Sequence, residues 1–115
     1  MLFAVAKRIL DADFGLVLAG NFSRGISETD LLVLTESHDS VLIHCRAQTD
    51  VIAARLSSHR RDRHEGHFDR DVLPDVLAAI EAGSYEPVAI GCPWLVVDTN
   101  EGYEPSRQQI VEFCR

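Results

Sequence analysis

The sequence predicts an α/β fold with three layers, in which a parallel sheet of about three strands is flanked by helices. Two observations support this prediction. Short, almost wholly apolar runs occur at residues 16–19, 41–45 and 94–99, and such runs are typical of parallel strands that are buried on both faces. Segments with helical spacing of apolar residues precede, separate and follow these runs, as right-handed crossover connections require.

Local start signals predict five helices around these strands. Ser27, for example, is a capping residue followed by the carboxylates of Glu28 and Asp30, which favour the positive end of a helix. Gly83 is placed to end the fourth helix, since glycine readily adopts the left-handed conformation found there. The helices are expected to begin near Leu2, Ser27, Thr49, Asp69 or Asp71, and Glu104.

Composition limits the class of protein. The 115 residues are 46% hydrophobic and 25% charged, as in a single globular domain that buries a core. No apolar run reaches the ~20 residues that cross a bilayer, and Lys7 and Arg8 follow the first apolar residues instead of preceding them. The net charge of -7 argues against general nucleic-acid affinity, which needs a basic face. We therefore expect a cytoplasmic protein that binds neither membranes nor nucleic acids.

Positive charge is concentrated in residues 55–69, although the whole chain is acidic. Guanidinium groups match phosphate oxygens two at a time, so a cluster of them after a helix suits a polyphosphate. An ion-paired, solvated surface is the alternative that spacing alone leaves open. The arginines of this cluster are Arg55, Arg60, Arg61 and Arg63.

The same segment contains His59, His64 and His67, which together with Glu65 could ligate zinc. Their spacing matches no established ligand pattern, and the neighbouring arginines would repel a cation. We therefore expect no metal site there.

Four motifs follow one another along the chain: G-N-F-S-R-G after the first predicted strand, H-C-R-A at the end of the second, R-x4-R-R-x-R-H-x-G-H-x-D after the third helix, and P-W-L-V-V-D-T at the last strand. This order resembles the carboxyl-terminal two thirds of a P-loop kinase. The most similar group is the small-molecule kinases that include zeta-toxin-like and chloramphenicol-phosphotransferase-like proteins. The R-H-x-G-H-x-D element followed by the V-D-T strand is the most specific part of the resemblance.

The resemblance implies an ATP-dependent phosphotransferase that transfers the γ-phosphate to a hydroxyl of a small molecule. Residues 59–70 would form a mobile, arginine-rich lid. The lid arginines that would act on the transferring phosphate are Arg60, Arg61 and Arg63. The residues that would bind the cofactor are Arg55, at the ATP phosphates, and Thr99 and Asn100, near the adenine. Those that would contact the acceptor substrate are Asn21, Arg24, His64 and His67.

One part of the family pattern is missing. A Walker A loop, G-x4-G-K-[ST], cradles the phosphates and holds magnesium, but the only lysine here, Lys7, follows Ala6. Ala19 stands where the family commonly has an acidic residue that helps to hold magnesium. We therefore expect a truncated P-loop kinase-like domain spanning residues 1–115. It would bind neither ATP nor Mg²⁺ tightly, and it would be inactive unless a phosphate-binding loop completed it.

The missing part also predicts an interaction. The family's Walker A strand lies between the strands that correspond to residues 16–19 and 41–45. Without it, these strands must pair directly, keep unpaired edges or recruit a partner chain, because a buried unpaired backbone group costs roughly 1–3 kcal/mol. We expect the strands to close up or the chain to self-associate. The alternative function is a non-catalytic remnant that binds a phosphorylated ligand or a partner chain.

Several single residues carry weaker expectations. Trp94 is expected in the core at the start of its strand, with stacking on a base as the alternative. Asp98 is expected to be either a general base or a helix-capping carboxylate. The three cysteines are expected to be reduced thiols, two of them packed in the core.

Overall fold

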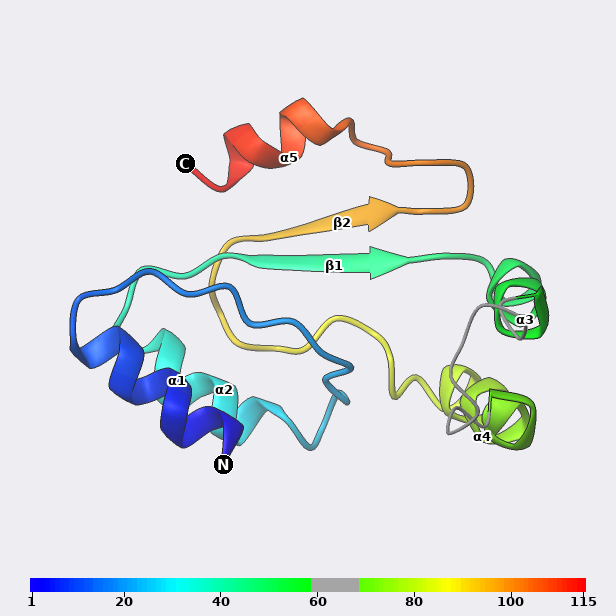
Figure 1. Ribbon diagram of the computed structural model, residues 1–115, viewed down its shortest axis with the longest axis horizontal. Coiled ribbons are helices and arrows are strands. Elements are labelled where there is room, and N and C mark those ends of the chain that lie inside the picture. The colour runs from blue at the N-terminus through cyan, green and yellow to red at the C-terminus, as the bar shows by residue number, and fades with distance from the viewer. Residues whose placement is uncertain (59–68) are drawn as a thin grey trace. The chain divides into compact units, whose positions relative to one another are not determined.

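The computed structural model describes residues 1–58 and 69–115. Within them the protein mixes helix and strand, with five helices and a two-stranded parallel sheet (Figure 1). None of these described helices is both long and apolar enough to span a lipid bilayer.

The described chain divides into two compact units. Unit 1 comprises Met1–Leu42 and Ser84–Pro93, and unit 2 comprises Ile43–Gly83 and Trp94–Arg115. Each unit therefore contains two segments that lie far apart in the sequence, so neither corresponds to one half of the chain.

Unit 1 is built on helices α1 (Leu2–Asp11) and α2 (Glu28–Thr35), which contact each other. Helix α2 begins after Ser27 with Glu28 and Asp30 in its first turn, as predicted. The expected cap by Ser27 does not form, because the Ser27 hydroxyl accepts the Ser23 N–H over 3.0 Å and bonds no N–H of the helix. Its buried residues Leu31 and Leu34 are three positions apart, which places them on one face of the helix.

The core of unit 1 forms where α2 meets the second segment of the unit. Leu31 of α2 is buried together with Val88 and Ile90. The ring of Phe3 on α1 lies 6.3 Å from that of Phe22, measured between centroids, and the two rings are tilted by 45°. Partly buried apolar residues that pack against this core are Phe3, Leu18, Phe22, Leu32, Leu42 and Cys92.

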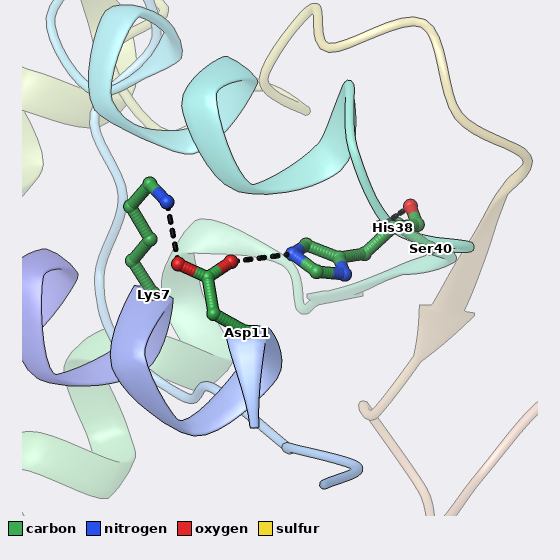
Figure 2. A network of polar contacts seen from close by, with 4 residues as sticks. All are labelled: Lys7, Asp11, His38 and Ser40. Atoms are coloured by element: carbon green, nitrogen blue, oxygen red, sulfur yellow. Dashed lines mark hydrogen bonds and ion pairs between the residues drawn. The ribbon is translucent and has the colours of Figure 1, made fainter. Parts of the chain in front are cut away.

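A polar contact ties the end of α1 to the loop that follows α2 (Figure 2). The Asp11 carboxylate lies 2.6 Å from Lys7 Nζ and 3.5 Å from His38 Nε2. The hydrogen bond from Lys7 is the main reason why the pKa of Asp11 lies below its usual value, and the charges of Lys7 and His38 add to it. Because the Lys7 and Asp11 side chains are half exposed, solvent screens the pair and it adds little stability.

Unit 2 contains the rest of the regular structure. Its strands are β1 (Leu42–Arg46), which begins at the last residue of unit 1's first segment, and β2 (Trp94–Asp98). Its helices are α3 (Thr49–Ser58), α4 (Asp69–Glu81) and α5 (Arg107–Phe113). Helices α3 and α4 contact each other.

The two strands run in the same direction (Figure 1). At their beginning, the Leu42 N–H donates to the Pro93 carbonyl over 2.9 Å, and at their end the Thr99 N–H donates to the Arg46 carbonyl over 2.8 Å. Both strands therefore end at the same edge of the sheet. Val97 of β2 is 1% exposed, which makes it the most deeply buried side chain among the described residues.

Helix α5 confirms the predicted start signal near residue 104. The Ser106 hydroxyl accepts the Gln109 N–H over 3.3 Å, and the Gln109 side-chain oxygen accepts the Ser106 N–H over 2.8 Å. This reciprocal capping box satisfies two backbone donors that would otherwise lack partners at the start of the helix.

The structure corrects the prediction of a third strand. Residues 16–19 form no strand and no ladder, and Val17 is 92% exposed while Leu18 packs on the core of unit 1. The apolar run therefore marks a connecting segment with one buried side chain, and the described sheet has two strands instead of about three.

Two further expectations about burial are wrong. Trp94 is 57% exposed at the start of β2, so it is not a core residue. Cys92 is the one described cysteine that packs against a core, whereas Cys45 and Cys114 are exposed. Both Trp94 and Cys114 lie at the ends of their elements, where apolar character does not require burial.

Candidate functional site

The carboxyl end of β2 leads into a turn that its own side chains hold. The Asp98 N–H donates to the Glu104 carbonyl over 2.8 Å, and the Glu104 N–H returns a bond to the Asp98 carbonyl over 3.0 Å. Inside the turn, the Asp98 carboxylate accepts the Asn100 N–H over 2.8 Å and the Asn100 side-chain amide over 3.1 Å. Asp98 thus holds the turn after β2, a role different from the helix cap that was one of its two expected roles.

A second set of bonds joins this turn to the loop that follows β1. The Asn100 side-chain oxygen accepts the Gln48 N–H over 2.7 Å, just before α3 begins. The Thr99 hydroxyl donates to the Arg46 carbonyl over 3.0 Å, next to the ladder bond of the Thr99 N–H. Both strands end at this edge of the sheet, so the turn after β2 lies next to the loop after β1. The bond from Gln48 and the bonds of Thr99 hold the turn to that loop.

Arg55 of α3 provides the third attachment. Its Nη1 donates to the Thr99 hydroxyl over 3.3 Å. Its Nη2 donates to the Thr99 carbonyl and, over 3.3 Å, to the Asn100 carbonyl. These residues are 44 and 45 positions apart in the sequence, so only the fold brings them together.

An open, polar hollow of about 350 Å³ lies at this edge. It adjoins a second hollow, of about 530 Å³, that also reaches Val51 and Glu101. The walls contain the carboxylates of Asp98, Glu101 and Glu104, which accept hydrogen bonds, and also the guanidinium of Arg46, which donates them. The excess of carboxylates suits the amino groups of a ligand better than its phosphates. The residues that line the first hollow are Arg46, Ala47, Gln48, Val96, Asp98, Asn100 and Glu104.

A different polar loop, at residues 21–25, precedes α2 in unit 1. Glu28 holds it: one carboxylate oxygen accepts the Gly25 N–H over 2.7 Å, and the other accepts the Ala89 N–H over 3.3 Å. The bond from Gly25 is the largest of the causes that keep the pKa of Glu28 below its usual value. The Arg24 N–H donates to the Ser84 carbonyl over 2.8 Å, while the Arg24 side chain stays exposed.

The predicted site residues fall into three groups. The expected cofactor residues Arg55, Thr99 and Asn100 are in direct contact. Asn21 and Arg24, expected at the acceptor, lie together in the loop of unit 1, and both are exposed. Outside the described residues lie the expected lid residues Arg60, Arg61, Arg63, His64 and His67.

Gln48, Glu104 and Glu28 take part in these two polar regions, although the sequence analysis did not predict them as site residues. Gln48 and Glu104 take part through backbone groups, which a side-chain pattern does not reveal. Glu28 was recognised only as a first-turn carboxylate, since its bond to Ala89, 61 positions away, has no local signal.

The described residues also limit what the site can hold. Within residues 1–58 and 69–115, no group of three or more histidine, cysteine, aspartate or glutamate residues is placed to bind a metal ion. Comparison with protein-family models, with curated proteins and with solved structures finds no match for this chain.

Proposed function

We propose that this chain is the lid-bearing part of an ATP-dependent small-molecule kinase, with the edge after β2 as its nucleotide-binding region. One contact in the structure is the main support for the proposal. Arg55, in the first segment of unit 2, contacts the neighbouring residues Thr99 and Asn100 in its second segment, and the family resemblance assigns all three to one cofactor.

The chemistry of the edge favours a base over a phosphate at the hollow. Carboxylates and carbonyl oxygens accept hydrogen bonds, so they can pair with the exocyclic amino group of adenine. The same carboxylates would repel phosphate oxygens, although Arg46 at the first hollow would attract them. In the proposal, the phosphates are bound by the arginines that follow α3 in the sequence, Arg60, Arg61 and Arg63.

The loop at residues 21–25 is proposed to meet the acceptor substrate. Its backbone is held by Glu28 and by the Arg24–Ser84 bond, so little conformational entropy remains to be lost on binding. Exposed Asn21 and Arg24 can then offer an amide and a guanidinium to the hydroxyl groups of a small molecule.

The residues present do not suit Mg²⁺. The sequence contains no G-x4-G-K-[ST] motif, and the described residues hold no cluster of acidic ligands placed for a metal. Phosphoryl transfer depends on the phosphate-binding loop and its metal for positioning and charge neutralisation. The proposed activity therefore requires a phosphate-binding loop that is not among these 115 residues.

Isothermal titration calorimetry of the chain with ATP, with and without Mg²⁺, tests the proposal. Weak binding that does not depend on magnesium is expected, because the arginines can hold phosphates while the metal lacks ligands. The double variant R60A/R61A should lose this binding. The variant R107A/R115A, which removes the same charge near the end of the chain, should keep it. Tight, magnesium-dependent binding by wild type, or full binding by R60A/R61A, would contradict the proposal.

An alternative function, self-association without catalysis, is favoured by one feature of unit 1. Phe14 is 68% exposed and Val17 is 92% exposed in the segment that connects α1 to the loop at residues 21–25. Exposed apolar side chains close together in the sequence are a feature of surfaces that meet a partner, and the alternative assigns a second copy of the chain to this segment.

The mass in solution, measured by multi-angle light scattering, distinguishes this alternative. If the segment mediates self-association, F14D/V17D should be monomeric under conditions in which wild type is dimeric. V111D, which alters an exposed apolar residue of α5, should behave like wild type. A monomeric wild type, or a dimer that F14D/V17D does not disrupt, would reject the alternative.

A further inference from the structure

We infer that Arg55 is a positioning residue that holds the Thr99–Asn100 turn against α3, and not a contact for ATP phosphates. The inference rests on the proposed function and changes the role of one of its residues. It starts from the observation that both terminal nitrogens of the guanidinium already donate to this turn.

The geometry of a guanidinium explains why this matters. Arginine binds phosphate most effectively when two of its N–H groups point at two oxygens in parallel. Here Nη2 donates to two successive backbone carbonyls, and Nη1 donates to the Thr99 hydroxyl. A phosphate could engage the same fork only by displacing these bonds, and the turn would then lose its link to α3.

Arg55 can affect ligand binding because the turn that it holds forms part of the wall of both hollows. Asn100 lines both hollows, and its side chain is already fixed by Asp98 and by the Gln48 N–H. These bonds hold the turn to itself and to the loop after β1. Arg55 adds the connection to α3, so the wall of the hollow is formed before a ligand arrives.

The test compares ligands that carry a base, phosphates or both. Affinities for adenosine, ATP and inorganic triphosphate are measured by calorimetry for wild type, R55K and R107K. Lysine keeps the positive charge but cannot donate to two carbonyls as a planar fork. If Arg55 positions the turn, R55K should weaken adenosine and ATP by the same factor, about tenfold, and leave triphosphate unchanged. R107K, an exposed arginine on α5, should match wild type throughout.

Amide hydrogen exchange gives a readout that needs no ligand. In R55K, the amides of Gln48 and Thr99 should exchange about tenfold faster, because the turn that protects them loosens. The Ile110 amide, bonded within α5 to the Ser106 carbonyl, should be unaffected.

The outcomes separate this inference from the proposed function. If R55K weakens ATP and triphosphate but not adenosine, Arg55 is a phosphate contact and the inference is wrong. It is equally wrong if the exchange of Gln48 and Thr99 is unchanged. If wild type binds none of the three ligands, the proposed function fails, and the exchange experiment alone then decides the positioning role.

Discussion

Two polar loops of this protein are held by side chains of opposite charge. In unit 1, the Glu28 carboxylate accepts backbone N–H groups from Gly25 and Ala89. In unit 2, the Arg55 guanidinium donates to the backbone carbonyls of Thr99 and Asn100. The N–H groups bound by Glu28 come from the loop before α2 and from residue 89, and the carbonyls bound by Arg55 come from the turn after β2. The sign of each charge matches the backbone groups that it binds, since a carboxylate only accepts hydrogen bonds and a guanidinium only donates them.

The largest effect is expected from removing the arginine. R55A leaves two carbonyls without their charged donor, and such bonds contribute about 1.5–3 kcal/mol each, less where solvent reaches them. We expect R55A to lower the free energy of unfolding of unit 2 by about 2 kcal/mol. Urea titration followed by the fluorescence of Trp94, the chain's one tryptophan, reports on that unit. An equal midpoint for R55A and the control R107A would show that the contact carries no stability.

A smaller loss of stability is expected when a glycine of either loop is replaced by alanine. Gly25 has φ of 88° and Gly102 has φ of 89°, and an added Cβ at either would meet no atom within 4 Å. The cost of alanine there is therefore conformational only, about 1 kcal/mol in each loop.

Circular dichroism during urea unfolding of G25A and G102A measures this cost. G15A is the matched control, because Gly15 also has open space around it but no positive φ, and alanine there should be neutral or slightly stabilising. Equal effects in all three variants would mean that φ does not determine the cost.

The smallest effect is expected when the pH is lowered. Acid should weaken the loop held by Glu28 and leave the turn held by Arg55 unchanged. The folded-state pKa of Glu28 is lowered from 4.5, so its contribution is present above that value and is lost as the pH falls through the lowered pKa. Arginine stays charged throughout this range. Protection of the Gly25 amide should therefore fall in acid, while protection of Thr99 should persist.

The variant E28Q keeps an acceptor for these amides but removes the charge. It should lower the protection of Gly25 about threefold near neutral pH and abolish its dependence on pH in the acid range. E36Q, which alters an exposed carboxylate at the end of α2, is the matched control. If E28Q retains the acid response, another group must hold the loop.

Much of the secondary structure could be read from the sequence because its signals are local. Ser106 caps α5, Ser27 marks the start of α2 without a side-chain cap bond, and the apolar runs near residues 41–45 and 94–99 form β1 and β2. The run at residues 16–19 has the same composition but forms no strand. An apolar run indicates that some side chains are buried, whereas a strand also needs a neighbour whose backbone can pair with it.

Local sequence patterns are enough to place the starts of the helices, two of the three expected strands and the arginine cluster after α3. They do not identify the strand pair: residues 16–19 are expected to close up against residues 41–45, whereas β1 pairs with β2. The tertiary structure decided that Arg55 reaches the Thr99–Asn100 turn, that Glu28 reaches Ala89, and that Val17 faces solvent. The reason is physical: capping and periodicity depend on neighbours within a few residues. Contacts between groups 44 or 61 positions apart depend instead on how whole elements pack.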